Sequence, residues 1–283
     1  MSRRHDIEER LAGLADIGRI MRSMKNLSYM ETRKLGRFMD AQRRVVASIE
    51  AAARDFLSHH PDLLEALAGA TADAPPCWLL IGAERGFCGD YNEAVLEALE
   101  ERLSSTAGPV ALVAVGSRLA AALEQDPRVV TVIPGATTAE EVGAVLARIL
   151  DTLDGIATRR HALRLKVLHW DDASDRVRAV SLLPPFQDSA PGPPEHRSPP
   201  LLNLPPGAFL ERLVDHTLLA ALQALLYSAL TAEHQHRLRH LEGALNRIDE
   251  RTRALTLRRN LWRQEEITEE IELILLNRPA ARH

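Results

Sequence analysis

Proline is absent from two long stretches of this chain, and this absence constrains the fold more than any other feature of the sequence. No proline precedes Pro61 and none occurs between residues 207 and 278, whereas nine of the sixteen prolines fall between Pro184 and Pro206. Because proline breaks a helix interior, the pattern predicts two long helices with a proline-rich loop before the second. The expected segments are a first helix at 1–60, a linker at 188–206 and a last helix at 207–283.

The first stretch carries an apolar repeat of seven residues. One register comprises Ile7, Leu14, Met21, Leu35, Ile49 and Phe56, interrupted by the polar Ser28 and Gln42. A companion register three positions on, as a coiled-coil seam requires, comprises Ile17, Met24, Phe38 and Val45. A helix of about 50 residues would be roughly 75 Å long, which exceeds a compact domain. The repeat therefore predicts pairing with another helix of similar length.

The last stretch provides that partner. A seven-residue apolar repeat recurs there at Leu241, Ile248, Leu255 and Trp262. About 70 residues of helix extend roughly 105 Å, so in an antiparallel pair the C-terminal end would pass the first helix by roughly 30 Å. At that end four apolar residues, 273–276, cover every side of a helix. They predict an enclosing apolar socket in another protein, and the alternative is a tip that packs on its own chain.

The middle region alternates strand-like and helical patterns. Strands are expected at 77–83, 110–116, 129–134, 163–170 and 176–183, with helices at 92–103, 118–124 and 139–153. Such alternation predicts a mostly parallel α/β sheet, with the last two strands forming an edge hairpin. The predicted fold class is therefore α+α/β, a long antiparallel coiled coil of N- and C-terminal helices with a Rossmann-like α/β domain inserted at 75–187.

Composition excludes several classes of function. A net charge of −4, from 35 basic and 39 acidic residues, gives no general attraction to nucleic acid. Two cysteines, Cys77 and Cys88, are too few for a disulfide framework. The charged start has no apolar segment behind it, which argues against a signal peptide. The most apolar stretch, 218–230, is shorter than the roughly 18–20 residues that span a bilayer, so no transmembrane segment is expected.

The glycine-rich turn GAERGFCGDYN, residues 82–92, is the strongest candidate for a ligand loop. A phosphate-binding Walker A loop needs Lys and Ser or Thr after its last glycine, but Asp90 and Tyr91 follow Gly89. The dinucleotide fingerprint would have a glycine where Glu84 stands. No base and orienting group at a recognisable spacing would activate Cys88, and a packed small residue is the better interpretation.

Other candidate sites are also weak. His236 and His240 have the spacing of zinc ligands on one helical face, but they lack the glutamate of a metalloprotease motif, and with His234 they fit a charged, solvated face better. Adjacent carboxylates, Glu140 with Glu141 and Glu265 with Glu266, point apart on a helix. We therefore predict no catalytic residue, no metal site and no cofactor.

Two motifs and their order resemble the γ subunit of F-type ATP synthases. The first strand of the α/β region ends in R-G-x-C-G-x-x-N, and the last helix carries R-Q-x-x-I-T-x-E. The first motif is met by Arg85, Gly86, Cys88, Gly89 and Asn92, and the second by Arg263, Gln264, Ile267, Thr268 and Glu270. The stretch around Met24 and Lys25 is similar to the family's first helix. The likeness covers nearly the whole chain.

The resemblance implies a non-catalytic rotor. In the family the coil turns inside a hexamer of α and β subunits and drives each β subunit through its catalytic states. Below, it meets the ε subunit and the membrane c-ring, at the cytoplasmic face of the bacterial inner membrane. The residues of both motifs, with Met24 and Lys25, would be contacts that couple the subunits. Departures such as Asp90 and Tyr91, where the family usually has glycine and leucine, leave open a divergent, alternate complex.

Two alternatives remain at the level of the sequence. In the first alternative, the α/β domain belongs to a nucleotide-binding enzyme and the coil is a dimerisation arm. In the second, the coil is an adaptor without a rotary role. Nucleotide binding by residues 75–187 would distinguish the first, and retention of function after removal of the last ten residues would distinguish the second.

Overall fold

The computed structural model describes residues 2–70, 74–104, 108–160, 163–186 and 198–276. These residues form two compact units, one made of Ser28–Arg237 and the other of Met1–Leu27 with Leu238–His283. The two longest helices, α1 (Ser2–His59) and α6 (Pro206–Leu276), contribute to both units. Most of the predicted proline-rich linker lies outside the described residues, and the predicted domain boundaries remain a prediction.

The first heptad register of α1 is buried at most of its positions, and Leu14 and Ile49 are half-buried. Its six most buried members are Ile7, Met21, Ser28, Leu35, Gln42 and Phe56, all at most 9% exposed. Gln42 donates to the carbonyl of Ala220 on α6 at 2.9 Å, and Ser28 is 3% exposed. The register read from the sequence is therefore confirmed.

The companion register is wrong for three of its four members, and only Met24 is partly buried. Ile17, Phe38 and Val45 are 50%, 39% and 47% exposed. The second buried register lies four positions after the first instead of three, and its most buried members are Gly18, Met39 and Ala53. At 3.6 residues per turn, these two choices lie on opposite sides of the first register, and the partner helix decides which one is covered. Small residues in that register permit a close approach, and a Cβ on Gly18 would lie 3.8 Å from Ile248.

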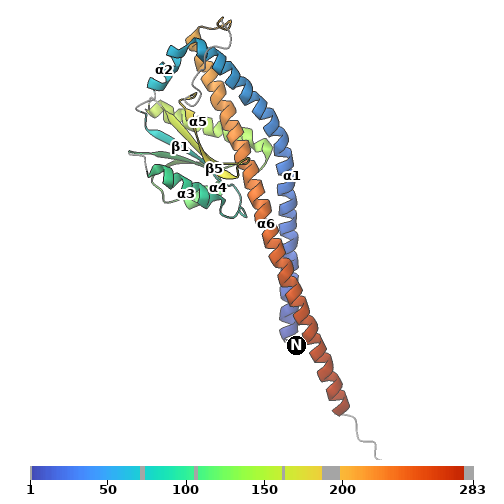
Figure 1. The fold of residues 1–283 in the computed structure, drawn as a ribbon. Coiled ribbons are helices and arrows are strands. Elements are labelled where there is room, and N and C mark those ends of the chain that lie inside the picture. The colour runs from blue at the N-terminus through green and yellow to red at the C-terminus, as the bar shows by residue number, and fades with distance from the viewer. Residues whose placement is uncertain (1, 71–73, 105–107, 161–162, 187–197, 277–283) are drawn as a thin grey trace, which may run out of the picture. The chain divides into compact units, whose positions relative to one another are not determined.

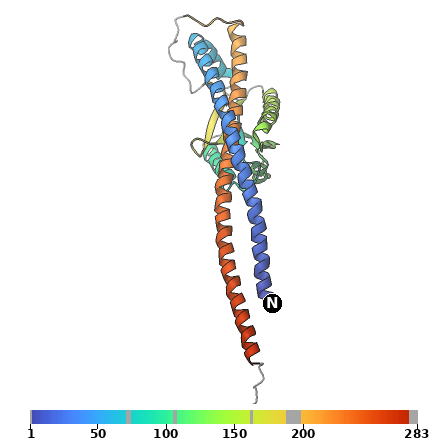
Figure 2. The same cartoon turned by 90° about the vertical axis from the view of Figure 1, so that its right-hand side faces the viewer.

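In the smaller unit, α1 and α6 run antiparallel (Figures 1 and 2). Lys25 pairs with Glu242 at 2.8 Å, Arg22 lies 3.8 Å from Asp249, and Ile7 lines a hollow with Trp262. Because α1 begins five residues before Ile7, α6 extends about nine residues, roughly 14 Å, past the start of α1. The overhang is present but shorter than expected.

The larger unit contains a five-stranded sheet in the order β3-β2-β1-β4-β5. Its strands are β1 (Pro76–Ile81), β2 (Ala111–Val115), β3 (Val129–Ile133), β4 (Arg164–Asp171) and β5 (Arg176–Leu183). The first four pair in parallel, and β5 pairs with β4 antiparallel at the edge. The predicted strands and the edge hairpin are confirmed.

Helices cover both faces of the sheet (Figure 1). On one face the odd-numbered residues of β1, such as Leu79, pack with α5 (Val142–Arg160) and with apolar residues of α6. A short 3-10 turn, η1 (Ala139–Glu141), precedes α5. On the other face, Trp78 and Leu80 pack with α3 (Tyr91–Leu103) and α4 (Ser117–Ala122). Burial on both faces is what the nearly continuous apolar strands require.

One short helix was not expected, α2 (Pro61–Ala70), which begins at a proline. Proline is well tolerated in the first turn of a helix, so Pro61 both ends α1 and starts α2. Among the described residues α6 is the helix long and apolar enough to cross a membrane, over an 18-residue window that is 44% buried in the protein. Packing of α6 on the sheet covers part of that apolar surface, and the absence of a membrane span stays a prediction.

Candidate functional site: a glycine loop held by a buried ion pair

The glycine loop leaves the end of β1 and turns into α3 under tight steric constraints. A Cβ on Gly82 would lie 2.4 Å from Leu119, and a Cβ on Gly116 would lie 2.6 Å from the Gly82 carbonyl. Gly89 has φ +64°, a conformation that favours glycine. The side-chain oxygen of Asn92 accepts from the backbone N–H of Ala83 at 2.9 Å. The last residue of the motif therefore closes the loop on its own first turn.

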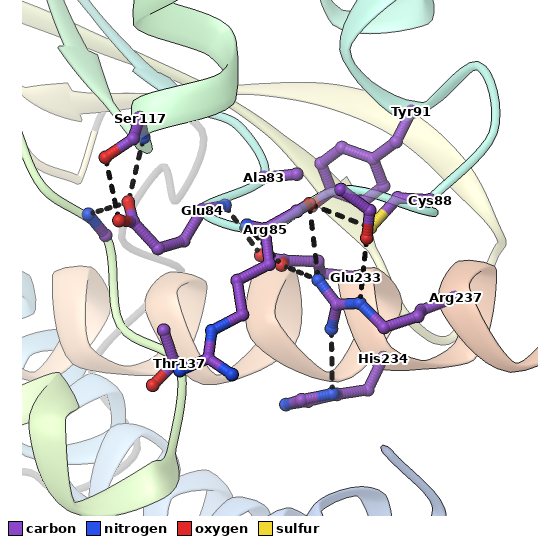
Figure 3. A network of polar contacts seen from close by, with 12 residues as sticks. Ala83, Glu84, Arg85, Cys88, Tyr91, Ser117, Thr137, Glu233, His234 and Arg237 are labelled. Atoms are coloured by element: carbon purple, nitrogen blue, oxygen red, sulfur yellow. Dashed lines mark hydrogen bonds and ion pairs between the residues drawn. The ribbon is translucent and has the colours of Figure 1, made fainter. Parts of the chain in front are cut away.

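Two residues of α6 hold the middle of the loop (Figure 3). Glu233 accepts hydrogen bonds from the backbone N–H groups of Glu84, at 3.1 Å, and Arg85, at 3.2 Å. Arg237, one helical turn later, forms an ion pair with Glu233 and donates to the carbonyls of Gly86, at 3.1 Å, and Arg85, at 3.3 Å. The two side chains are each 5% exposed. The ion pair thus satisfies donors and acceptors of the loop backbone at once.

The surroundings of this ion pair shift several pKa values. Burial raises the pKa of Glu233, and the charge of Arg237 acts against that shift. Burial, with the charge of Glu233, raises the pKa of Cys88 to about 12. The Cys88 thiol donates to the Arg85 carbonyl at 3.3 Å. A thiol in this state is not a nucleophile at neutral pH, which agrees with its interpretation as a small packed residue.

Glu84 connects the loop to the next two strands. Its carboxylate accepts from the N–H of Ser117 at 2.8 Å, the hydroxyl of Ser117 at 2.7 Å and the N–H of Gly135 at 2.6 Å. A bound phosphate would need free backbone N–H groups at this edge of the sheet. Carboxylates of Glu84 and Glu233 occupy them and would repel an anion. The geometry therefore disfavours the nucleotide-binding alternative.

The histidines of α6 correct a prediction. His234 is 4% exposed and its Nδ1 lies 3.1 Å from Arg237, so the ring accepts from the guanidinium. Burial, with the charge of Arg237, lowers the pKa of His234 to about 4. His236 packs edge-on to Trp170, with ring centroids 4.3 Å apart, and lies 3.3 Å from Asp175. The predicted solvated face is wrong for both, because the sheet unit packs on this part of α6, while His240 is exposed.

The remaining predicted residues fall in separate places. Arg85 is exposed beside the loop, and Lys25 pairs with Glu242 in the smaller unit, where Met24 packs against Met21 and Leu241. The second motif lies near the end of α6, and all its members are exposed: Arg263, Gln264, Ile267, Thr268 and Glu270. Thr268 donates to the Gln264 carbonyl within the helix at 2.8 Å. The structure brings the loop residues together and leaves the second motif open to solvent.

Sequence reasoning missed Glu233 and Arg237, which organise the loop. The available signal was a pair of opposite charges four residues apart, directly after the most apolar part of the last helix. Charges at that spacing support each other on any helix surface, so the pattern alone does not distinguish a buried pair from an exposed one.

Known proteins match this chain over most of its length. A family model described as ATP synthase matches residues 3–275. The chain belongs to this ATP synthase family. Its curated relatives include the ATP synthase gamma chains of Moorella thermoacetica, 24% identical over 96% of both chains, and Saccharopolyspora erythraea, 27% identical over 94% of this chain and 96% of the relative.

Solved structures of the ATP synthase family share the fold. A chain of the Euglena gracilis mitochondrial ATP synthase OSCP/F1/c-ring assembly aligns with a TM-score of 0.63 at 17% identity, covering 96% of this chain and 92% of its own length. A rotor chain of the same enzyme aligns with a TM-score of 0.59, covering 93% and 98%. The resemblance read from the two motifs is confirmed. The chain is thus a γ-type member of the ATP synthase family, and it shares the fold of the rotor chain of this enzyme.

Proposed function

We propose that this subunit turns inside a hexamer of α and β subunits and couples ion flow through the membrane sector to the conformational cycle of the catalytic β subunits. The observation that carries the proposal is the free end of α6. Beyond the start of α1 it exposes Ile271, Leu273 and Ile274 at 52%, 60% and 68%. An apolar surface of this kind requires a cover, and an apolar sleeve would hold it without directional bonds that fix one angle.

The contacts that couple the subunits are proposed from the two motifs. Arg263 and Gln264 are exposed on α6 and suit polar, angle-dependent contacts with a β subunit, and Ile267, Thr268 and Glu270 extend the same region. Met24 and Lys25 would contribute from α1. Polar contacts of this type bias a partner's conformation only where they differ between its states. Exposed residues such as Arg85 are better placed for such contacts than Cys88 or the loop backbone. Cys88 and the loop backbone are buried or held by α6, and they stabilise the larger unit.

The expected partners follow from the same proposal. They are the α and β subunits of the hexamer, the ε subunit and the membrane c-ring. The complex would lie at the cytoplasmic face of the bacterial inner membrane, with this chain peripheral to the bilayer.

A rotation measurement tests the proposal. The full chain, carrying Glu101→Cys, would be assembled with the α and β subunits of its own organism and labelled there with a bead. Glu101 is 83% exposed on α3, and both native cysteines are buried, so the label enters at one position. ATP is expected to drive continuous rotation in one direction. Assembly of the hexamer without rotation, or failure of the chain to join the hexamer, would contradict the rotor role.

A truncation separates the rotor from the adaptor. Removal of residues 267–283 deletes the exposed apolar end and part of the second motif. We expect ATP-driven rotation or pumping to fall while the larger unit, measured by its melting temperature, remains folded. Unchanged activity would favour the adaptor.

A further inference from the structure

A cavity of about 290 Å³ lies within the larger unit, away from the glycine loop. Three elements line it: α1 through Met39 and Arg43, the β4–β5 hairpin through His169 and Asp171, and α6 through residues that include Tyr227. Cavities that hold small organic ligands begin at about this size. The cavity has no part in the proposed rotary contacts, and the inference drawn from it does not depend on them.

The inner wall of the cavity is mainly apolar. Met39 is 8% exposed and Tyr227 is 6% exposed, and partly buried Val180 and Leu225 complete the wall. A thioether beside aromatic and aliphatic side chains favours a flat, aromatic occupant, because sulfur contacts ring edges favourably. The wall therefore suits a ring system more than a flexible polar molecule.

His169 is a buried polar side chain that an occupant of the cavity can reach. His169, 3% exposed, lines the cavity, and its Nδ1 lies 2.8 Å from the Trp170 carbonyl. A carbonyl only accepts, so Nδ1 carries the proton and Nε2 of the neutral ring is an acceptor. Within the described part of the chain, Nε2 has no hydrogen-bond partner. A hydroxyl in the cavity would satisfy it.

The charges around the cavity are already balanced. Arg43 lies 3.9 Å from Asp172, and Arg178 lies 3.5 Å from Asp171. Asp172 also accepts from the Ser228 hydroxyl at 2.9 Å, and Asp171 from the Ser174 hydroxyl at 2.6 Å. Each carboxylate thus has a guanidinium and a hydroxyl partner. The cavity offers no unbalanced charge to a cationic or an anionic ligand.

We propose that this cavity binds an uncharged, two-ring aromatic compound that donates one hydrogen bond, from a hydroxyl group, to Nε2 of His169. The rings would contact Met39, Leu225 and Tyr227. The bound compound would connect α1, the β4–β5 hairpin and α6, three elements of one unit.

The probe is 2-naphthol, tested against the full-length chain. Binding is followed through the methyl signals of ¹³C-labelled methionine, since Met39 is the methionine among the residues that line the cavity. We expect the Met39 signal to move on titration. 2-Methoxynaphthalene keeps the rings and loses the donor, so it should bind about tenfold more weakly, the effect of one lost hydrogen bond. 2-Naphthoate, which carries a charge, should bind more weakly still.

Two variants test the site itself. His169→Asn keeps a donor toward the Trp170 carbonyl and removes the Nε2 acceptor, so the affinity for 2-naphthol should fall about tenfold. Ala224→Met fills the cavity from α6 without changing a polar group, and it should abolish the shift of the Met39 signal. His216→Asn makes the same substitution at an exposed position of α6 outside the cavity, and it should leave binding unchanged.

Melting temperatures establish that each variant is folded, and Ala224→Met alone tests the site if His169→Asn does not fold. Absence of 2-naphthol binding up to its solubility limit would overturn the proposal. So would equal affinity for the methoxy compound, or binding that persists in Ala224→Met.

Discussion

Replacement of Glu233 by glutamine should destabilise the larger unit strongly. Glutamine keeps the shape of the side chain but removes its charge, which leaves Arg237, 5% exposed, buried without a counterion. Breaking a buried ion pair from one side costs about 3–5 kcal/mol. Arg237 still reaches the carbonyls of Arg85 and Gly86 and the ring of His234, so we expect the lower end, about 3 kcal/mol.

The expected loss converts into a measurable shift. For a unit of about 200 residues, each kcal/mol lowers the melting temperature by about 2–4 °C, so Glu233→Gln should lower it by about 6–12 °C in differential scanning calorimetry. Hydrogen exchange gives a local readout. The backbone N–H groups of Glu84 and Arg85 lose their charged acceptor, and exchange in the peptide 82–90 should accelerate.

A matched control is available on the same helix. Glu242→Gln makes the same substitution in the exposed pair with Lys25, whose side chains are 60% and 35% exposed, and should cost less than about 1 kcal/mol. The double variant Glu233→Gln with Arg237→Met should lose less free energy of unfolding than the two single variants lose together, because no unpaired charge remains buried. If Glu233→Gln and Glu242→Gln shift the melting temperature equally, the reasoning about the buried pair is refuted.

Three further predictions concern other positions. The raised pKa of Cys88, about 12, predicts that iodoacetamide at pH 8 leaves it unmodified in the folded chain and modifies it in denaturant, by mass spectrometry. Gly116→Ala should lower the free energy of unfolding by more than about 1 kcal/mol, because φ at this position is +109°. Gly13→Ala lies at a helical position with open space around it and should raise the free energy of unfolding by about 0.5–1 kcal/mol. Calorimetry distinguishes the two signs. A hydrogen bond from Arg128 lowers the pKa of Asp126 below its ordinary value of 3.8. The ionised Asp126 therefore stabilises the folded chain fully above pH 3.8, and this contribution is lost as the pH falls through the pKa of Asp126 in the folded state. Acid titration of Asp126→Asn should accordingly show a flatter fall in stability below pH 5; a parallel curve would contradict this.

Regular patterns in the sequence predicted much of the fold. The first heptad register, including the polar Ser28 and Gln42, was assigned correctly because a helix repeats its buried face at a fixed spacing. Alternation of strands and helices gave the sheet and its edge hairpin. The side of the register that the partner helix covers was not predictable, because it depends on where α6 lies, and the exposed Ile17, Phe38 and Val45 are the result.

The sequence predicted only part of the candidate site. The loop residues from Arg85 to Asn92 stand close together in the chain and were recognised by their motif. Glu233 and Arg237 come about 150 positions later, and only the tertiary fold brings them to the loop. His234 was misjudged for the same reason, because its burial is a property of the sheet that packs on α6 and not of its neighbours in the chain.

The uncovered apolar end of α6 also has a consequence for the life of the protein before assembly. A newly made copy with Leu273 and Ile274 exposed is open to self-association and to recognition by chaperones and proteases until its partners arrive. Synthesis in step with those partners, rather than in excess, is therefore a requirement for its accumulation, and production of the chain alone in a foreign host is expected to give aggregates.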